Sequence, residues 1–491
     1  MMYMKLLLMI SVGLIAIELK LNIIWNLIQV EKERVDLAVC VLSARGNFKQ
    51  RQTLRETWFN DKYYNNRTIR IKSVFVVGRP GCCIHPENRL DQFDCKRWNY
   101  SVPDNPDNIA LFQISNKHST NIGYSTVDRL WIKVQHPVRI KRLGIANILT
   151  SAFKPELLNS IRVGLATFDQ GELEEIVSVQ FSYMDSGILH TGYSYQPITE
   201  RHLRKDEEYE IYVEGLPTSF VFGDSETTIM NGVGAVVVEG LTADRTYINN
   251  SNINSLVSFM FNVDKIEELR NKRDKRDNLD LEWQSREVEV EAELSKEVKE
   301  NGDILLVDTM DVYRNLPQKL LACHRWFYDN YKVDFVLKTD DDCFVDIRSI
   351  FNNLHVYPSN KLWLGHFRND WLVQRSSKWR ERYYTSQIYP KFACGSGNVV
   401  SSDVHRWLAE NYLDLFVGYQ GEDTAMGIWL SALGVNYEQH SRFVCDFFLK
   451  CSKPFVVPNL NTTEIQVMWV NSIKCGFPGG CSCKQTIHHG G

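Results

Sequence analysis

Nearly continuous apolar runs near the start of the chain predict buried strands of a parallel sheet. Residues 35–44 (VDLAVCVLSA) and 71–78 (IKSVFVVG) are rich in β-branched and other apolar side chains along their whole length. Between them, residues 47–59 repeat apolar side chains at helical spacing. A run without polar alternation is typical of a strand that is buried on both faces. Strand, helix and strand with short joins therefore predict a βαβ unit.

The same pattern returns in the second half of the chain. Residues 303–308 (DILLVD) predict a strand, and residues 316–327 place apolar side chains on one face of a helix. Residues 334–338 then predict another strand, which runs directly into three aspartates at 340–342. Ligands of open α/β sheets collect outside the carboxyl ends of the strands. The three carboxylates are therefore expected at the mouth of a site.

The segment between these two halves has a different pattern. From residue 120 to residue 262, short runs alternate apolar and polar positions, and no helical spacing interrupts them. This pattern predicts an inserted β-rich module of the sandwich type. Residues 263–302 carry a dense mixture of both charges, which indicates a solvated helix that returns to the α/β part. The clearest runs of the module are residues 144–151, 160–168, 174–183, 208–215 and 235–241.

The first thirty residues predict a membrane segment. Residues 5–30 are strongly apolar, although Glu18 and Lys20 interrupt them. The uninterrupted part, Leu6 to Ile17, has about the length of a signal peptide, but no small-residue cleavage site follows. We favour an uncleaved signal anchor, with a cleaved signal peptide as the alternative. Either way, the rest of the chain is expected in the lumen of the secretory pathway.

Composition narrows the class of protein. Of the 491 residues, 44% are hydrophobic, which supports packed cores, and a formal net charge of -4 gives no reason to expect a nucleic-acid partner. Twelve cysteines fit an oxidising compartment, and several crowd the tail. Disulfides are expected there, with a zinc site that uses His488 and His489 as the alternative. Cys343 and Cys394 flank two central segments and are a further candidate pair.

Three consecutive aspartates at a strand end suit a divalent cation. Carboxylate oxygens are the ligands that hard cations prefer, and such a cation leaves room for phosphate oxygens. The alternative is a capped turn at the start of the following helix. An EF-hand is excluded because Asp342 is not followed by alternating ligands or by the central glycine.

Five ordered motifs resemble the β-1,3-glycosyltransferases, a family of inverting enzymes with the GT-A fold. The resemblance covers about residues 35–80 and 290–450. It implies a Rossmann-like α/β catalytic domain that is interrupted by the β-rich insert. The motifs are RQTLRETW (51–58), DILLVDTMDVYRNLPQKLL (303–321), VLKTDDDCFVDI (336–347), CGSGNVVSSDV (394–404) and GEDTAMGIWLSALGV (421–435). The expected segments are an anchor (1–30), catalytic parts (31–119 and 303–450), the insert (120–262), the charged helix (263–302) and a Cys-rich tail (451–491).

The resemblance assigns roles to the acidic motifs. Asp340 and Asp342 are implied to bind Mn²⁺ or another divalent cation together with the diphosphate of a UDP-sugar, and Asp341 is expected to contact the donor. Asp423 is implied to be the base that deprotonates the acceptor hydroxyl, with Glu422 beside it at the substrate. A plain helix N-cap is the alternative for Asp423.

Other site candidates follow from residue type and position. Arg51 and Arg55 lie one helical turn apart and suit phosphate or uridine, although a packed, salt-bridged helix is an equal alternative. Residues 395–397 are a further candidate, because Gly395, Ser396 and Gly397 allow a close approach of backbone to ligand, with a simple tight turn as the alternative.

A histidine and four aromatic residues are further site candidates. The family supplies a metal-binding histidine downstream of the Glu-Asp helix, and His440 is the candidate here, although its spacing is short and a surface histidine is the alternative. Aromatic side chains between the metal motif and residue 395 have faces that suit sugars, although single aromatic residues are more often core. These are Trp363, Trp371, Trp379 and Tyr389.

The implied activity is metal-dependent transfer of a sugar with inversion. We expect UDP-N-acetylgalactosamine as donor and a terminal N-acetylglucosamine of a glycoprotein glycan as acceptor, joined by a β-1,3 linkage. UDP-galactose is the alternative donor, and a glycan-binding protein without activity is the competing class. The expected location is the Golgi or endoplasmic reticulum membrane, as a single-pass type II protein.

Overall fold

The computed structural model describes most of the chain after residue 31. The predicted anchor, residues 5–30, lies outside the described residues. Among the residues that are described, no helix is both long and apolar enough to cross a membrane. The described residues are 32–60, 63–64, 69–118, 126–147, 161–169, 172–182, 187–215, 225–229, 232–241, 254–375, 377–446, 448–449 and 451–483.

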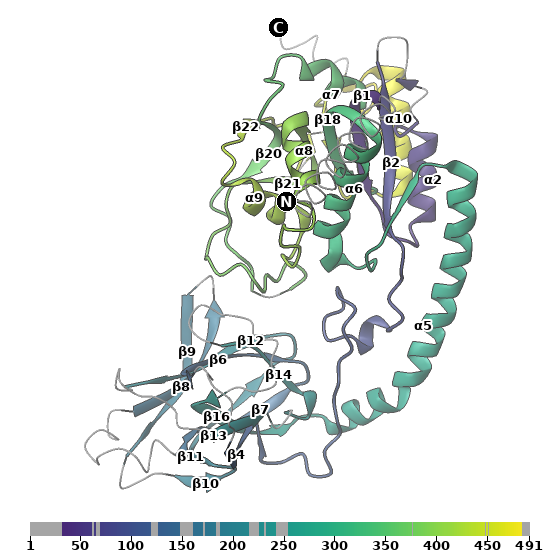
Figure 1. The fold of residues 1–491 in the computed structure, drawn as a ribbon. Coiled ribbons are helices and arrows are strands. Elements are labelled where there is room, and N and C mark those ends of the chain that lie inside the picture. The colour runs from purple at the N-terminus through teal and green to yellow at the C-terminus, as the bar shows by residue number, and fades with distance from the viewer. Residues whose placement is uncertain are drawn as a thin grey trace, which may run out of the picture.

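A seven-stranded mixed sheet forms the centre of the α/β part (Figure 1). Its order is β17-β2-β1-β18-β21-β20-β22, and the four strands from β17 to β18 are parallel. β21 is antiparallel to both of its neighbours. The apolar runs at 35–44, 71–78, 303–308 and 334–338 correspond to the four parallel strands, so that prediction is confirmed. The strands are β1 (Glu33–Leu42), β2 (Ile71–Gly78), β17 (Ile304–Val307), β18 (Tyr331–Asp340), β20 (Leu362–Arg368), β21 (Phe392–Ser401) and β22 (Asn436–Gln439).

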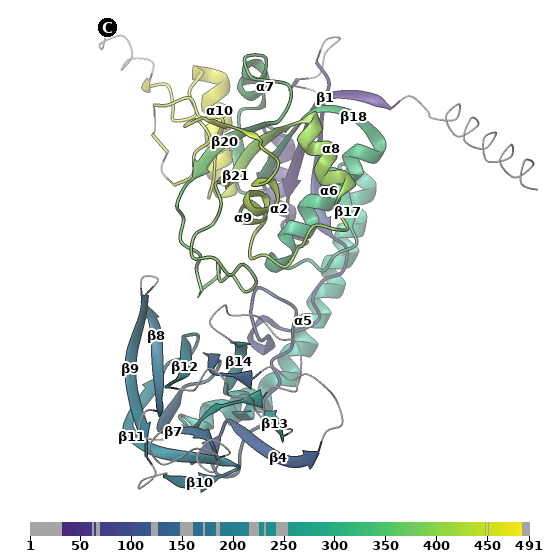
Figure 2. The ribbon, with the colours of Figure 1, turned by 60° about the vertical axis from the view of Figure 1, so that its left-hand side comes forward.

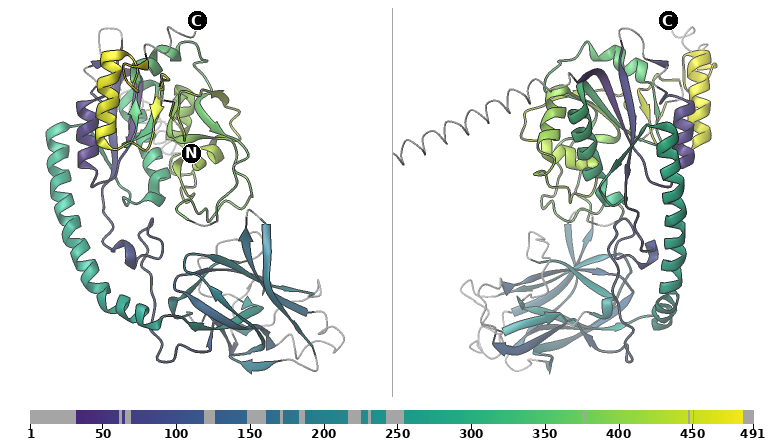
Figure 3. Two further views of the ribbon diagram at one scale, coloured as in Figure 1. Left: turned by 180° about the vertical axis from the view of Figure 1, so that it is seen from behind. Right: turned by 45° about the vertical axis from the view of Figure 1, so that its right-hand side comes forward.

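Helices cover both faces of this sheet. One core cluster joins the sheet to α6 (Leu316–Asn330), α8 (Ser402–Glu410) and α9 (Glu422–Leu430). A second cluster, on the opposite face, joins it to α2 (Phe48–Glu56), α7 (Ile347–Leu354) and α10 (Thr462–Cys475). Figure 3 shows α2 and α10 side by side on that face. The sheet is therefore buried on both sides, which explains why its parallel strands are apolar at consecutive positions.

Between β2 and the helix α5 (Ile266–Asn301), the chain forms two five-stranded antiparallel sheets. We call residues 109–263 the two-sheet region. Their strand orders are β10-β11-β7-β16-β3 and β14-β6-β12-β8-β9. The strands are β3 (Ile109–Ala110), β6 (Arg129–Val134), β7 (Val138–Ala146), β8 (Ile161–Asp169), β9 (Glu172–Phe181), β10 (Ile188–His190), β11 (Tyr193–Leu203), β12 (Glu208–Glu214), β14 (Val236–Leu241) and β16 (Val257–Val263).

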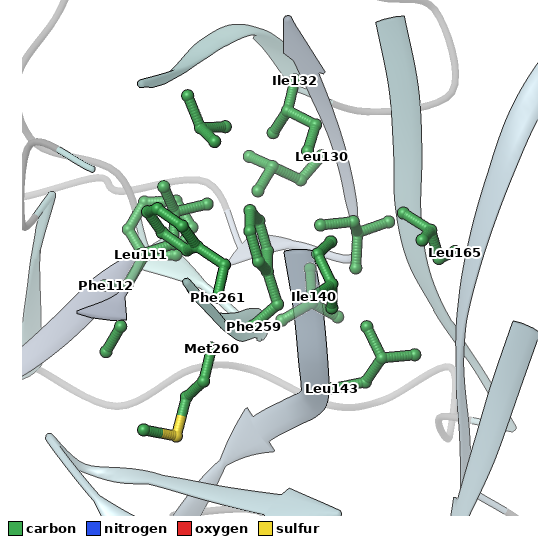
Figure 4. Packing of buried hydrophobic residues seen from close by; sticks show 14 of the residues in the cluster. Leu111, Phe112, Leu130, Ile132, Ile140, Leu143, Leu165, Phe259, Met260 and Phe261 are labelled. Carbon is green, nitrogen blue, oxygen red and sulfur yellow. The ribbon is translucent and has the colours of Figure 1, made fainter. Parts of the chain in front are cut away.

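Both sheets contribute to one hydrophobic core. Side chains from both sheets meet in this core, among them Ile132 of β6, Ile140 of β7 and Phe259 of β16 (Figure 4). Such packing of alternate side chains explains the period-two pattern in the sequence. Short elements complete the structure: β4 (Phe112–His118), β5 (Thr126–Val127), β13 (Ser225–Ile229), β15 (Asn254–Ser255), β19 (Phe344–Val345), β23 (Val456–Val457), and the 3₁₀ turns at Pro86–Asn88, Gly232–Gly234 and Tyr313–Asn315.

The long helix α5 (Ile266–Asn301) connects the two-sheet region to the α/β part (Figure 2). It agrees with the charged helix expected at 263–302, and most of its side chains are exposed. Acidic side chains lie in its first turn, and Gly302 follows its C-terminus with a φ of 65°, a left-handed conformation that glycine adopts at low cost.

Four disulfides lie in the described part of the chain. Two of them, Cys451–Cys483 and Cys475–Cys481, join the tail, so the expectation of disulfides there is confirmed. A third links Cys82 to Cys95. Cys394 pairs with Cys445, and Cys343 is a buried free thiol. The suggested pairing of Cys343 with Cys394 is therefore wrong, because Cys445 of the following segment occupies the partner position.

Candidate active site

A cavity of about 740 Å³ lies at the carboxyl ends of the central parallel strands. Its walls come from the ends of β1 and β18, from β21, from the start of α9 and from the loop between β20 and β21. Asp340 is the last residue of β18 and pairs in register with Leu42 of β1. The sheet thus places the three aspartates where the sequence predicted them, and all three line the cavity.

Lys338 connects the aspartate motif to α9. Alternation along β18 puts Lys338 and Asp340 on the same side, and the Lys338 Nζ atom lies 2.8 Å from Asp340 Oδ1. The same ammonium group donates to Glu422 Oε1 at 2.6 Å and to the carbonyl oxygen of Gly395. Burial raises the pKa of Asp340 to about 7; Lys338 opposes this shift, whereas the carboxylates of Glu422 and Asp342 add to it.

Asp341 points toward the loop after β1. Its Oδ2 atom accepts hydrogen bonds from Ser43 Oγ at 2.6 Å and from Asn47 Nδ2 at 2.9 Å. Burial raises the pKa of Asp341, and these two hydrogen bonds partly offset that rise. Asp341 therefore fixes two polar residues of the cavity wall, while its two neighbours in the motif remain for a ligand.

Asp423 lies in the first turn of α9 and lines the same cavity as the aspartate motif. Its Oδ1 atom accepts from the backbone N–H of Thr424 at 2.7 Å. Burial and the adjacent carboxylate of Glu422 raise the pKa of Asp423 to about 7, against smaller opposing effects of the hydrogen bond from Thr424 and of Lys338. A carboxyl group with this pKa exchanges its proton near neutral pH, as a general base requires.

Glycine at position 395 allows these carboxylates to approach β21. A Cβ atom there would lie 3.2 Å from Glu422 Oε1 and 3.6 Å from Asp423 Oδ2. Any larger side chain would extend further toward the two oxygens. Gly395 and Ser396 both line the cavity, and Ser396 Oγ donates to the carbonyl of Val444 at 2.8 Å. Gly397 does not line the cavity. It faces Val456 instead, since a Cβ atom added to Gly397 would lie 2.9 Å from Val456 Cγ2.

The charges around this cavity do not balance. Seven acidic and three basic side chains line it. The acidic ones are Asp311, Asp340, Asp341, Asp342, Glu422, Asp423 and Asp446, and the basic ones are Lys319, Arg368 and Lys378. Lys338, which does not line the cavity itself, pairs with Asp340 and Glu422. Lys319 also lines the cavity, but its ammonium group donates to Asp311 and to the carbonyl of Ser43, each at 2.7 Å. Oxygen ligands with uncompensated negative charge are what Mn²⁺ and Mg²⁺ bind.

The protein side chains alone do not form a complete metal cage. In the part of the chain that the structure describes, no three His, Cys, Asp or Glu side chains converge to hold a metal ion. His440 is not among the residues that line the cavity. Its ring lies 4.6 Å from the ring of Phe455, and its Nδ1 atom accepts from the backbone N–H of Arg442 at 3.2 Å. The structure thus does not bring His440 to the aspartates.

Arg51 and Arg55 lie behind the cavity. Arg51 is fully buried and binds Glu297 of α5 at 2.7 Å. Arg55 binds Glu297 at 2.6 Å and Asp303 at 2.8 Å. Neither arginine lines the cavity, so their contacts are those of the packed, salt-bridged helix that the sequence left as the alternative. Arg51 reaches the site indirectly, since it donates to Ser43 Oγ at 2.9 Å.

Aromatic side chains form the wall beyond the carboxylates. Trp371 and Trp379 line the cavity with exposed fractions of 38% and 52%, and the buried Tyr389 also reaches it. Trp363, by contrast, is buried in the hydrophobic core between the sheet and α6, α8 and α9. Sequence reasoning missed Tyr313, which lines the cavity near the carboxylates; burial together with Glu422, Asp423 and Asp340 raises its pKa.

Sequence reasoning also missed Lys338 and Asn459. Lys338 is preceded and followed by strand residues, and only the alternation of side chains relates it to Asp340. Asn459 lies after β23, more than a hundred residues from the aspartates, and it lines the cavity with a φ of 59°. No local signal in the sequence connects that position with the site.

Comparison with known proteins agrees with this geometry. The galactosyltransferase family matches residues 283–441, which include the aspartate motif and the start of α9. UDP-GalNAc:β-1,3-N-acetylgalactosaminyltransferase 2 of Xenopus laevis is 32% identical, over 91% of this chain and 92% of its own length. The human protein of the same name is 30% identical, over 91% and 90%. β-1,3-Galactosyltransferase 6 of Mus musculus is 30% identical over 35% of this chain and 54% of its own.

Proposed function

Because the chain belongs to the galactosyltransferase family and is a glycosyltransferase, we propose that it transfers N-acetylgalactosamine from UDP-N-acetylgalactosamine. The acceptor is a terminal N-acetylglucosamine of a glycoprotein glycan, and the new bond is β-1,3. The observation that carries this proposal is that Asp340, Asp342 and Asp423 line the same cavity. Relatives named for this donor and linkage align over nine-tenths of the chain.

The fold assignment rests on the sheet and its site. We take the α/β part as a GT-A catalytic domain and the two-sheet region as an insert in it. A parallel-rich sheet with carboxylates at the carboxyl end of a central strand supports the assignment. Residues 1–30 act as a signal anchor, so that the chain is a single-pass type II protein of the Golgi or endoplasmic reticulum. Four disulfides support a lumenal location.

On the donor side, Asp340 and Asp342 would hold a divalent cation, with Asp342 as the direct ligand. A bound Mn²⁺ or Mg²⁺ would supply positive charge to the diphosphate as UDP departs. The uncompensated carboxylates fit such an ion, because hard divalent cations prefer oxygen ligands and leave room for the oxygens of a diphosphate. Asp341 holds Ser43 and Asn47 in the wall beside the donor.

On the acceptor side, Asp423 acts as the base. Its carboxylate takes the proton of the acceptor 3-hydroxyl while that oxygen attacks the anomeric carbon. The bond from this carbon to the oxygen of UDP breaks as the new bond forms, so the configuration inverts. General-base catalysis of this kind contributes about 10²- to 10⁴-fold to a rate. Glu422 bonds to Lys338, which places α9 and Asp423 against the aspartate motif.

UDP-galactose is the second candidate donor. The family is described as galactosyltransferases, and β-1,3-galactosyltransferase 6 matches a third of the chain. No described side chain identifies an N-acetyl pocket. The choice of donor therefore rests on the full-length relatives.

A donor panel tests the proposal. The purified full chain is incubated with Mn²⁺, a β-linked N-acetylglucosamine acceptor and one UDP-sugar at a time, and released UDP is measured with and without EDTA. Metal-dependent turnover with UDP-N-acetylgalactosamine alone is expected. Turnover with UDP-galactose alone would overturn the donor assignment. Glycan binding without turnover of any donor would overturn the enzymatic proposal.

A further inference from the structure

We propose that the two-sheet region positions the acceptor wall of the cavity, by holding the loop between β20 and β21 through Arg380. This loop comprises residues 369–391, of which residue 376 lies outside the description. The inference rests on the proposed function, because it assigns the two-sheet region a role in acceptor binding. Figures 1 and 2 show loops of the α/β part extending toward the strands of the two-sheet region.

The loop forms an aromatic wall with a defined backbone. Its two arms pair with each other: the N–H of Tyr389 donates to the carbonyl of Trp371 at 2.9 Å, and the N–H of Val373 donates to Gln387 at 2.8 Å. Trp371 and Trp379 line the cavity and leave part of their rings open to solvent. Partly exposed indole rings at a polar cavity suit the apolar face of a pyranose ring.

Arg380 ties the loop to the two-sheet region. Its guanidinium group is buried and binds Glu208 at the start of β12 through Nε and Glu239 of β14 through Nη2, the latter at 3.0 Å. Both glutamate side chains are about nine-tenths buried. A planar guanidinium that is held by two carboxylates from neighbouring parts of one sheet has little freedom to rotate or shift.

A second set of contacts closes the junction. Arg382 binds Asp91 at 2.9 Å, and Arg314 binds the same carboxylate at 3.0 Å. Arg314 also donates to the carbonyl oxygen of Arg380 at 2.8 Å. The segment of Asp91 is attached to the two-sheet region in turn, since Gln135 donates to the carbonyl of Leu90 at 3.1 Å. The loop is therefore held from two directions.

Glu381, the residue after Arg380, connects the loop to the start of α9. Glu381 is buried, and its Oε2 atom accepts from the backbone N–H of Gln420 at 3.0 Å and from the hydroxyl of Tyr389 at 3.3 Å. Gln420 immediately precedes Gly421, the N-cap of α9, whose first turn holds Asp423. Arg380 thus contacts the two-sheet region, while Glu381 contacts the residue that precedes the N-cap of α9. A shift of the loop moves both the aromatic wall and the residue before the catalytic helix.

The double variant Glu208→Gln/Glu239→Gln tests this role. It keeps both side-chain lengths and removes the two charges that hold Arg380. We expect the acceptor KM to rise about tenfold, the usual size of a coupling through packed contacts, while the donor KM changes less than twofold. Backbone amides of residues 369–391 should exchange with solvent faster, as measured by hydrogen–deuterium exchange. Arg380→Lys should give the same pattern with a smaller change. Lysine keeps the positive charge but lacks the planar guanidinium group that reaches both glutamates.

Glu210→Gln is the matched control. Glu210 lies on the same strand, is buried even more completely than Glu208, and pairs with Arg129 of β6 at 2.6 Å. This variant should leave the acceptor KM and the exchange of the loop unchanged, even where it lowers thermal stability. A double variant with unchanged acceptor KM and unchanged loop exchange would overturn the proposal, as would a control that reproduces both changes.

The same measurements separate this proposal from the proposed function. Failure of the wild-type chain to turn over any UDP-sugar would overturn the enzymatic function, and with it the role of the loop in acceptor binding. The exchange of residues 369–391 reports the position of the loop without any turnover. Faster exchange in the double variant, together with turnover of a donor other than UDP-N-acetylgalactosamine, would support the role of Arg380 and correct only the donor.

Discussion

Two of the buried charge clusters in the described residues differ in their balance. Beneath the loop between β20 and β21, three arginines bind four carboxylates, and each carboxylate has a guanidinium partner. At the carboxyl end of β18, Asp340, Asp342, Glu422 and Asp423 line one cavity, and Lys338 pairs with Asp340 and Glu422. The arginines at the junction are Arg314, Arg380 and Arg382, and their partners are Asp91, Asp94, Glu208 and Glu239.

The difference separates a structural cluster from a site. Burying charges is costly, and a balanced network recovers that cost through its own pairs. The cluster at β18 does not recover this cost, and burial next to other carboxylates raises the pKa values of Asp340 and Asp423. Its carboxylates also line a cavity, whereas the charged residues of the junction do not line that cavity. Uncompensated charge beside an open cavity indicates a ligand of opposite charge, and a cation with a diphosphate provides it.

The largest expected effect is the loss of the base. Asp423→Asn keeps the shape of the cavity and removes the group that accepts the proton, so kcat should fall about a thousandfold, or about 4 kcal/mol in activation free energy. Steady-state turnover with saturating donor and acceptor measures it. Asp446→Asn is the control, because Asp446 lines the same cavity in an ion pair with Arg368. Activity of Asp423→Asn within tenfold of wild type would contradict the assignment.

Removal of the shared cation should have the next largest effect. Lys338→Met leaves Asp340 and Glu422 buried without their partner, so the free energy of unfolding should fall by about 3 kcal/mol. Denaturant unfolding monitored by tryptophan fluorescence measures this change. Lys332→Met on the exposed end of the same strand is the control and should change stability by less than about 0.5 kcal/mol. Equal stability of both variants would mean that Lys338 does not hold the two carboxylates together.

A neutral buried pair provides a reference for both charged clusters. The Nδ1 atoms of His324 and His405 lie 2.9 Å apart between α6 and α8. Burial lowers the pKa of both, that of His405 to about 4, so both imidazoles are neutral in the folded state near pH 7. The unfolded chain, with histidine pKa values near about 6.5, binds more protons as pH falls.

Stability should therefore be complete above about pH 6.5 and decrease as the pH falls toward 4. Between pH 7 and pH 5 the expected loss is about 1 to 2 kcal/mol for each histidine. Denaturant midpoints at the two pH values measure it. The variant His324→Gln/His405→Gln should lose most of this pH dependence. An unchanged slope in that variant would mean that other groups cause it.

The smallest effect concerns the pH dependence of turnover. Since the pKa of Asp423 is raised to about 7, its basic form is lost as pH falls, and kcat/KM should decrease about tenfold per pH unit below that value. Glu422 contributes to the raised pKa through its negative charge. Glu422→Gln should move the acidic limb of the profile to lower pH. A shift toward higher pH would contradict the proposed origin of the pKa.

The parts that the sequence predicted are those with a local signal. The parallel strands are buried on both faces and therefore read as apolar runs, and the start of α9 follows from a motif next to an apolar helical face. β21 (FACGSGNVVS) lacked such a run because Gly395 and Gly397 make room for Glu422 and Val456. The hydrophobic pattern along β21 gives no sign that these two positions must leave room for distant side chains.

The site residues that were misplaced depend on distant partners. Arg51 resembles a phosphate ligand in its own segment, but its partner Glu297 lies 246 residues further along the chain. His440 has a suitable position after α9, but it packs on Phe455 of the following segment. Conversely, Asn459 reaches the cavity, and Lys338 reaches the carboxylates of Asp340 and Glu422, only through the pairing of strands and loops. Long-range packing decides these positions, and one sequence does not display it.

Donor binding to two variants tests the central claim most directly. The dissociation constant of UDP-N-acetylgalactosamine is measured by calorimetry with and without Mn²⁺ for wild type, Asp342→Asn and Asp423→Asn. Our account predicts that Asp342→Asn loses metal-dependent donor binding, while Asp423→Asn binds donor and metal as the wild type does and still fails to transfer the sugar. Metal-dependent donor binding that survives in Asp342→Asn, or that disappears in Asp423→Asn, would contradict the division of this cavity into a cation side and a base side.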